Sequence, residues 1–544
     1  MTIKDVSNGL LTSWLSNSIS KVYEQLNNHA KVNKIKLTGN IPVNVFENVD
    51  FKHGLIIEDY NSDDDLIFKN CSVEKITLLR PLKLKNLEFL SHKSNLTIIH
   101  SLENYTPDNP LTIQLNSFNY NFNLESDNNH LIIKRHINLK IYDSNIKDFT
   151  PKSVRYNFLT FENSNFESIL SLHCNGDKTN DTQVLIKNCK FNKSLDLTSS
   201  LECDMIHLEN LEFNGNHEGI FLTLKEYSKH RINFSNVNTP SLQVTTHNEQ
   251  HGSNSKIRIY NNSNINALRL FSLKTDSIDL TDSRVSYISL EHNLNTILRI
   301  KDLTEPINRF VTNELICSGI FAMENITISK EFKFSGAKLL NRTYFDRVIF
   351  NCPPEFHGSE IYTDTRFKDC KFNCLNEDSV GAYRVLKELM IGVHNHIEEL
   401  QFSSLELHAN WNVTDWKKDL PVFIFGGIYK LSNNFGRSVV LPILWLVNFT
   451  VYFYLIYDYF GKVYLDASKT ENHWHKTIEL YGQNAKNIGF SVINSLGPLK
   501  LHPSLSAFYS GDLTTLIAST VHSLLSSYFL FLIFTWVRRR FKTH

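Results

Sequence analysis

The sequence is poor in glycine and proline, with 20 and 13 among 544 residues. It has no glycine-rich phosphate loop, no nucleophile elbow and no HExxH motif. The usual signatures of nucleotide binding, ester hydrolysis and zinc proteolysis are therefore missing. Acidic residues are scattered, without a converging pair for glycoside cleavage. We expect no enzymatic activity and no cofactor.

A charge excess of one sign is also missing, because 56 Lys and Arg residues balance 56 Asp and Glu residues. A neutral chain without a basic patch before its C-terminal tail is not expected to bind nucleic acid. No basic segment followed by an apolar run opens the sequence, so we expect no secretory signal. The eight cysteines form no CxxC pair and indicate free thiols in a reducing compartment.

A degenerate repeat covers roughly residues 60–375. Each copy reads apolar, any, Asn or Asp, small, any, apolar, and the copies recur with a period in the low twenties. Strand-like alternation at this period is typical of a parallel β-solenoid, whose inward side chains stack from coil to coil. The clear copies are FKNCSV from Phe68, IYDSNI from Ile141, FENSNF from Phe161, IKNCKF from Ile186, YNNSNI from Tyr260, LTDSRV from Leu280 and FKDCKF from Phe367.

The spacing inside each copy resembles that of the pentapeptide-repeat family. The two large apolar residues are five positions apart, and the small residue comes two before the second. The resemblance implies a four-sided, right-handed coil in which both kinds of side chain point inward. We expect a mainly β fold, with a right-handed parallel β-solenoid over residues 31–376.

Three of the eight cysteines have a packing explanation. Cysteine takes the small position of the repeat, where other copies carry serine, at Cys71, Cys189 and Cys370. Cysteine and histidine are common zinc ligands. Four of them lie close together in the sequence, at Cys352, His357, Cys370 and Cys374. The exchange of cysteine with serine favours buried packing, so we expect no metal site.

Residues 1–30 predict a helical N-terminal cap. Apolar side chains fall near helical spacing from Val6 to Leu26. A solenoid needs a cap because its first coil otherwise exposes bare strand edges. The alternative is a helix on a membrane surface, which would carry a denser face of Lys and Arg.

After the repeat, residues 377–436 predict a helical neck. Apolar residues that include Tyr383, Leu386 and Met390 follow helical spacing along one helix of roughly thirty residues. An apolar stripe along one side of a helix has to be buried against another surface. That surface could be the last coil of the solenoid, a neighbouring subunit or a membrane.

Residues 437–544 predict a membrane domain. Two apolar segments, Ser438–Phe460 and Leu513–Val537, are long enough to cross a bilayer. Aromatic residues gather toward their ends, as in an interfacial belt. The alternative is a pair of core helices in a soluble domain, which the three arginines from Arg538 disfavour.

The flanking charges predict the orientation. Lys430 and Arg437 precede the first segment, and three arginines follow the second. Both termini are therefore expected in the cytoplasm, with residues 461–512 on the other side. Lysines within that loop reduce the asymmetry.

Three further motifs lie between Pro353 and Trp445: PPEFHG followed by DTRF, then AYRVLK, then FGRSVVLPILW. Together they look like a membrane-anchored branch of bacterial pentapeptide-repeat proteins. In that branch the tail is similar to the two-helix pore domain of potassium-type channels. The resemblance implies the bacterial inner membrane and a homo-oligomer such as a tetramer.

The stretch between the two spans stands where such a channel has its pore helix and filter. A short helix from about His475 to Val492, ended by Gly497-Pro498, would form a re-entrant loop over about 475–500. The NSLGP run does not match the carbonyl ladder of a TVGYG-type filter, so potassium selectivity is not expected. The candidate pore-lining residues are Ser491, Asn494, Ser495, Gly497, Pro498 and His522.

The second span carries polar residues of its own. Ser519, Ser523 and Ser527 repeat at four-residue spacing, which lets helices approach closely. His522 lies mid-span, where an ionisable group faces the bundle interior or water. We favour a hydrogen bond from His522 to a neighbouring serine, which joins helices, over a gating role.

Two functions remain open from the sequence. The first is a homo-oligomeric ion channel or membrane-permeabilising effector, gated through its cytoplasmic repeat domain and suited to antiviral defence. The second is a non-conducting, membrane-anchored scaffold whose solenoid binds a protein partner.

Overall fold

The computed structural model describes residues 3–6, 26, 28, 30, 34–38, 45–58, 65–79, 84, 86–100, 111–126, 136–152, 155–175, 182–201, 203–215, 219–224, 230–246, 255–460, 463–465, 482–496, 508–510 and 513–540. The chain divides into two compact units. The first, Met1–Cys352 with Phe356–Phe372, is a parallel β-solenoid, and the second, Pro353–Glu355 with Asn373–His544, is helical.

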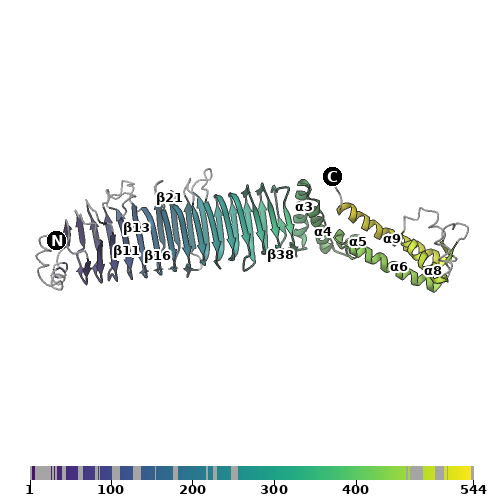
Figure 1. Ribbon diagram of the computed structural model, residues 1–544, viewed down its shortest axis with the longest axis horizontal. Coiled ribbons are helices and arrows are strands. Elements are labelled where there is room, and N and C mark those ends of the chain that lie inside the picture. The colour runs from purple at the N-terminus through teal and green to yellow at the C-terminus, as the bar shows by residue number, and fades with distance from the viewer. Residues whose placement is uncertain are drawn as a thin grey trace. The chain divides into compact units, whose positions relative to one another are not determined.

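Parallel strands of successive coils lie side by side along the solenoid (Figure 1). One sheet, the long sheet, follows the coils through β3 (Val45–Glu47), β6 (Leu66–Lys69), β9 (Asn86–Leu90), β11 (Leu111–Asn116), β13 (His136–Tyr142), β16 (Arg155–Glu162), β19 (Thr182–Lys187), β22 (Cys203–Glu209), β25 (Arg231–Ser235), β27 (Ser255–Tyr260), β29 (Lys274–Thr281), β31 (Leu294–Lys301), β33 (Ile316–Cys317), β34 (Phe321–Glu324), β36 (Lys338–Leu339), β37 (Thr343–Asp346) and β40 (Arg366–Lys368).

The other side of the coils is built by two further sheets. The early coils contribute β1 (Ile3–Val6), β2 (Lys34–Thr38), β5 (Leu55–Glu58), β8 (Lys75–Leu78), β10 (Leu96–His100), β12 (Phe122–Ser126) and β15 (Phe149–Lys152), with a short pair of β4 (Asp50–Phe51) and β7 (Ser72–Val73). The later coils contribute β14 (Asn145–Ile146), β17 (Asn165–Phe166), β18 (Leu170–Asn175), β20 (Lys190–Phe191), β21 (Leu195–Leu201), β23 (Glu212–Phe213), β24 (Gly219–Leu224), β26 (Asn238–Thr246), β28 (Asn264–Phe271), β30 (Arg284–Glu291), β32 (Ile307–Asn313), β35 (Thr327–Ser335), β38 (Ile349–Phe350), β39 (Pro354–Glu355) and β41 (Lys371–Phe372).

The Asn or Asp of the repeat motif turns the chain at a corner of the coil. Asn70, Asn163, Asn188 and Asn210 follow long-sheet strands, and each has φ of 52°. L-residues rarely adopt this left-handed conformation, and Asn and Asp tolerate it best. The polar position of the motif is therefore a backbone requirement.

The next residue of the motif points into the solenoid, as the repeat predicts. Ser144, Ser164 and Cys189 are buried. The Ser144 hydroxyl donates to the Tyr142 carbonyl oxygen at 2.6 Å and accepts from the Phe118 amide at 3.0 Å. Burial raises the pKa of the Cys189 thiol to about 12, so this cysteine is a protonated packing residue rather than a nucleophile.

Large inward residues stack from coil to coil. The rings of Phe46, Phe68 and Phe89 form one stack, with centroids 5.1 and 5.3 Å apart. Phe166, Phe191 and Phe213 form another, at 5.2 and 5.0 Å. Parallel in-register strands bring identical positions together, so the five-residue spacing of the motif becomes a column of rings in the core.

The predicted N-terminal cap lies mostly outside the described residues. Of residues 1–30, Leu26, Asn28 and Ala30 are helical, whereas Ile3–Val6 form strand β1. The helical cap predicted over residues 1–30 is therefore wrong at Ile3–Val6. There the backbone pairs in parallel with β2, which supplies hydrogen bonds along the strand edge.

The helical unit contains α3 (Glu377–Gly392), α4 (His396–Val413), α5 (Leu420–Asn433), the short η1 (Asn434–Gly436), α6 (Val440–Phe460), α8 (Gly482–Ser495) and α9 (Leu513–Arg540). Strands β42 (Val463–Leu465) and β43 (Phe508–Ser510) pair antiparallel. The short helix predicted from about His475 to Val492 corresponds to α8. Its described residues begin at Gly482 and end at Ser495.

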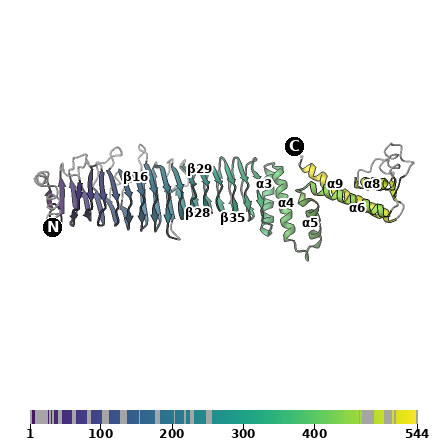
Figure 2. The ribbon, with the colours of Figure 1, turned by 60° about the horizontal axis from the view of Figure 1, so that its bottom comes forward.

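The neck begins with two helices rather than the single helix expected. α3 and α4 lie side by side (Figure 2). His394 takes a left-handed conformation with φ of 58°, and the Asn395 side chain caps α4 by accepting from the Glu398 amide. A left-handed residue stops one helix, and an Asn cap starts the next. The Glu406 carboxylate accepts from Arg384 and Lys387, which joins the two helices.

Candidate functional site

Within the described residues, α6 and α9 are long and apolar enough to cross a membrane. Only 17% of the most apolar stretch of α6 and 22% of that of α9 is buried within the protein. A core helix of a soluble protein would bury most of its apolar side chains. The exposure of α6 and α9 therefore favours a lipid environment.

Polar side chains gather where α6, α8 and α9 meet. Four of the candidate pore-lining residues are at most 7% exposed, namely Ser491, Asn494, Ser495 and His522. They bond to one another and to residues of α6 and α9. We call the following group the polar cluster: Thr450, Tyr457, Ser491, Asn494, Ser495, Ser519 and His522.

His522 joins all three helices. Its Nδ1 lies 3.2 Å from the Tyr457 hydroxyl on α6, and its Nε2 lies 3.0 Å from the Ser495 hydroxyl on α8. A neutral imidazole has one donor and one acceptor, and hydroxyl groups serve as either, so both contacts are satisfied at once. The imidazole also stacks on Phe453, with centroids 4.4 Å apart. The hydrogen bond expected between His522 and a serine is therefore present.

The polar residues of α8 are also bonded inside the cluster. Asn494 Nδ2 donates to the Tyr457 hydroxyl at 3.2 Å, and Asn494 Oδ1 accepts from the Ser519 hydroxyl at 3.3 Å. The Ser491 hydroxyl donates to the Thr450 carbonyl oxygen at 2.6 Å. The polar cluster thus meets most of its hydrogen-bonding needs within one chain, as buried polar groups in lipid must.

The opposite face of α8 is apolar. Ile488, Val492 and Leu496 are exposed and follow one another at four-residue spacing, which places them on one side of the helix. Asn484, one turn before Ile488, is the exposed polar residue of this row, so the apolar part of the face begins at Ile488. It fits acyl chains or another apolar protein surface.

The remaining sequence candidates divide into two groups. In the predicted serine row, Ser519 contacts α8, whereas the Ser527 hydroxyl donates to the Ser523 carbonyl oxygen of its own helix at 2.7 Å. Gly497 and Pro498 lie outside the described residues. A pore-lining role for Gly497 and Pro498 stays a prediction.

Sequence reasoning missed the α6 half of the polar cluster. Thr450 and Tyr457 lie in a run dominated by apolar and aromatic residues, so neither stands out in the sequence. The one available signal was their spacing of seven residues, two helical turns, which places both on the same face of α6.

The cysteine and histidine positions near residue 360 do not converge. Among the described residues, no group of three or more His, Cys, Asp or Glu side chains could hold a metal ion. The Cys370 thiol instead lies 3.4 Å from the Phe345 carbonyl oxygen of the preceding coil.

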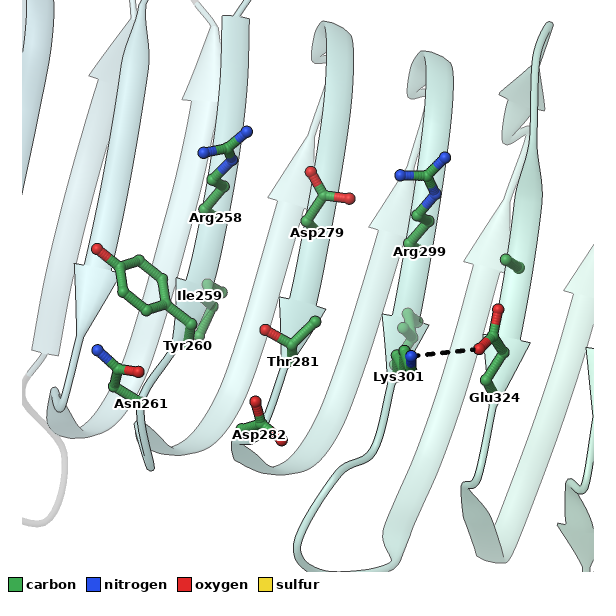
Figure 3. A pocket seen from close by; sticks show the side chains of 12 residues that line it. Arg258, Ile259, Tyr260, Asn261, Asp279, Thr281, Asp282, Arg299, Lys301 and Glu324 are labelled. Atoms are coloured by element: carbon green, nitrogen blue, oxygen red, sulfur yellow. Dashed lines mark ion pairs between the residues drawn. The ribbon is translucent and has the colours of Figure 1, made fainter.

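A second candidate site is an open hollow of about 540 Å³ on the long sheet of the solenoid. Arg258, Asp279 and Arg299 occupy matched positions on three neighbouring strands (Figure 3). They form no ion pair with another described residue, whereas Lys301 beside them pairs with Glu324 at 3.8 Å. The row offers two guanidinium groups and a carboxylate for recognition of a charged surface.

Several other charges on the solenoid are paired between coils. Lys187 pairs with Glu209, Lys190 with Glu212, and Arg309 with Glu331. Pairs of this kind place charges of opposite sign next to each other, whereas nucleic-acid binding or mimicry requires a stripe of one sign.

No family model, curated protein or solved structure matches the chain.

Proposed function

We propose that the protein is a membrane-anchored β-solenoid scaffold. In this proposal α6 and α9 hold the chain in a bilayer, and the solenoid binds a protein partner. The observation that carries the proposal is the direction of the polar side chains. In the helical unit they bond to one another inside the chain, while the exposed side chains of α6, α8 and α9 are mainly apolar.

This arrangement favours an anchor over a pore. A channel lined by Ser491, Asn494 and Ser495 would have to turn these side chains out of the polar cluster toward an axis shared by several copies. Each would give up a hydrogen bond made in a medium without competing water, where an unmet polar group is costly. The homo-oligomeric channel is thus the competing hypothesis.

The orientation follows from charge. Lys430 and Arg437 precede α6, and three arginines begin at Arg538 near the end of α9. Positive residues are retained on the cytoplasmic side of a membrane. We therefore assign the solenoid and both termini to the cytoplasmic face of a bacterial inner membrane.

The hollow on the long sheet is the surface we assign to a partner. The rigid sheet fixes the spacing of the three charged residues Arg258, Asp279 and Arg299, so a protein surface with complementary charges at the same spacing would be recognised. An alternating row of positive, negative and positive groups would select a partner with the opposite order of charges.

Ion flux and membrane flotation in liposomes test the proposal. The full-length protein is compared with a chain truncated before Asp419, which lacks α5 and both spans, and with Asn494→Trp. We expect the full-length protein to float with liposomes, the truncated chain to stay in solution, and neither to cause dye or ion leakage. Leakage that depends on the tail and changes in Asn494→Trp would establish the channel instead. Failure of the full-length protein to float would overturn the anchor.

A further inference from the structure

Helix α5, just before the first span, carries an exposed apolar face. Leu420, Ile424, Phe425, Ile428 and Leu431 are each between 46% and 70% exposed. Their spacing of four, one, three and three residues places them on one side of the helix. No acidic residue lies within Leu420–Asn433. Contiguous apolar surface of this kind marks a contact with a partner or with lipid.

The other face of α5 is fixed by α4. A side-chain carbon at Gly426 would come within 2.3 Å of the Trp411 ring, so glycine allows this close approach. Trp411 Nε1 donates to the Phe423 carbonyl oxygen at 2.9 Å, and the Lys430 ammonium lies 4.3 Å from the centre of the Trp411 ring. Because Trp411 occupies the glycine side, the apolar face points away from α4.

The C-terminal end of α5 lies beside both candidate spans. The Leu431 carbonyl oxygen accepts from Trp445 Nε1 of α6 at 3.0 Å, and the Ser432 hydroxyl lies 3.0 Å from the Tyr528 hydroxyl of α9. Tyr528 comes ten residues before Arg538, about 15 Å along the helix. The end of α5 is therefore at the level of the apolar part of α9, not beyond its charged end.

We propose that α5 is embedded in the leaflet where α6 begins and α9 ends, with its apolar face against lipid acyl chains. This inference rests on the proposed membrane anchor. At 14 residues the helix is about 21 Å long, too short to cross a bilayer, so it lies along the leaflet as an interfacial helix does. Trp416 and Lys417, stacked 5.7 Å apart just before α5, are of the types that favour the interface.

Continuity of apolar surface identifies lipid as the occupant. Val440 begins α6 seven residues after α5 ends at Asn433 and is itself exposed, as are Ile443 and Leu444 in the next turn. A bilayer that covers α6 at this level also reaches α5, because Leu431 and Trp445 are hydrogen-bonded neighbours. A second copy of the chain would have to cover α5 while leaving the adjoining span surface to lipid.

Fluorescence quenching tests the placement of α5. An environment-sensitive fluorescent amino acid is placed singly at Phe425, at Val451 in α6 and at Ile391 in α3, in full-length protein in phosphatidylcholine–phosphatidylglycerol vesicles. All three positions are exposed, so a label disturbs little packing. We expect blue-shifted emission and quenching by spin-labelled lipids at 425 and 451, and quenching by aqueous acrylamide alone at 391. A label at Ile428 repeats the test should the variant at 425 misfold.

The outcomes separate this inference from the proposed function. Acrylamide quenching at 425 with lipid quenching at 451 would overturn the placement of α5 and leave the anchor intact. Acrylamide quenching at both positions would overturn the anchor itself. Protection of 425 from both quenchers, with cross-links between copies at that position, would replace lipid by a second copy and overturn the inference.

Discussion

At the scale of single residues, corner asparagines stabilise the solenoid in two ways. Each adopts the left-handed conformation that the turn requires, and the side chains of Asn163, Asn188, Asn210 and Asn236 also bond to the corner residue of a neighbouring coil. Asn210 Nδ2 donates to Asn188 Oδ1, and Asn210 Oδ1 accepts from Asn236 Nδ2, both at 2.8 Å. Asparagine at these corners of the coil therefore has a structural cause.

Asn210→Ala separates these contributions when it is compared with Asn210→Gly. Both variants remove the side-chain bonds, but only alanine keeps a Cβ that disfavours the left-handed corner. We expect alanine to lower the free energy of unfolding by about 1–2 kcal/mol more than glycine does. Urea unfolding followed by the strand signal in circular dichroism measures the difference. Equal losses in the two variants would show that backbone conformation at the corner is not limiting.

A buried histidine makes the solenoid sensitive to acid. His92 is 2% exposed, and its ring stacks on Phe118 with centroids 5.6 Å apart. Burial lowers the pKa of His92 from 6.5 to about 4, against a smaller opposing effect of the Val73 backbone. The unfolded chain therefore takes up a proton at a higher pH than the folded chain does.

The expected result is a loss of stability on acidification. As the pH falls from about 6.5 to about 4, the free energy of unfolding should drop by about 3 kcal/mol through His92 alone. The drop should level off below about pH 4, and the titration of His92 should not change stability near pH 7.5. His92→Phe, which keeps an aromatic ring in the core, should lack this part of the drop. Urea unfolding at pH 7.5 and pH 4.5 compares the two proteins, and an identical pH dependence would contradict the prediction.

At the scale of elements, the helices of the second unit depend on polar contacts as well as on apolar packing. Phe453, Tyr457 and Phe490 form an apolar core between α6 and α8. The imidazole of His522 adds a bond to each of these helices from α9. In a membrane the hydrophobic effect does not drive helices together, so packing and polar contacts between them determine their arrangement.

His522→Phe tests the polar contacts while keeping a flat ring against Phe453. It removes the bonds to Tyr457 and Ser495 and leaves two buried hydroxyl groups without this partner. We expect a destabilisation of about 1–2 kcal/mol, seen as a lower melting temperature of the helical signal in detergent. Thr520→Ala is the matched control, because the Thr520 hydroxyl is exposed and bonds to Leu516 of its own helix. Equal melting temperatures for the two variants would argue that the cluster does not stabilise the helices.

At the scale of the whole molecule, each coil of the solenoid is supported by its two neighbours. Strand β29 pairs with β27 before it and β31 after it, and Lys274 and Leu294 occupy matched positions. Among the described strands, β29 has no partner in its sheet beyond these two neighbours. The solenoid is therefore quasi-one-dimensional, and its stability is close to a sum over coils and their interfaces.

Removal of one whole coil should then be tolerated. Deletion of residues 274–293 brings Leu294 into the place of Lys274 and keeps inward residues inward. We expect the strand signal and membrane flotation of this variant to remain near those of the full chain. Deletion of residues 274–283 alone is the control, because it removes one strand and a corner and breaks the register of every later coil. Loss of folded protein in the whole-coil deletion would contradict independent coils.

The sequence by itself determined the elements whose signal is local. The five-residue spacing of large side chains and the small position between them predict coils, because in-register stacking needs the same residue type at the same place in each turn. Uncharged runs of about 20 residues predict long exposed helices, because length and apolarity are properties of the segment alone.

Tertiary structure alone decided what the polar residues of the second unit contact. Asn494 and Ser495 have the same composition and spacing whether they face water or another helix, and α6 and α9 place Tyr457 and His522 against them. The break between α3 and α4 at His394 and the exposure of α5 could likewise not be predicted from local sequence patterns. Whether an apolar side chain is buried depends on which distant segment packs on it, as Trp411 does on one face of α5 and nothing described does on the other.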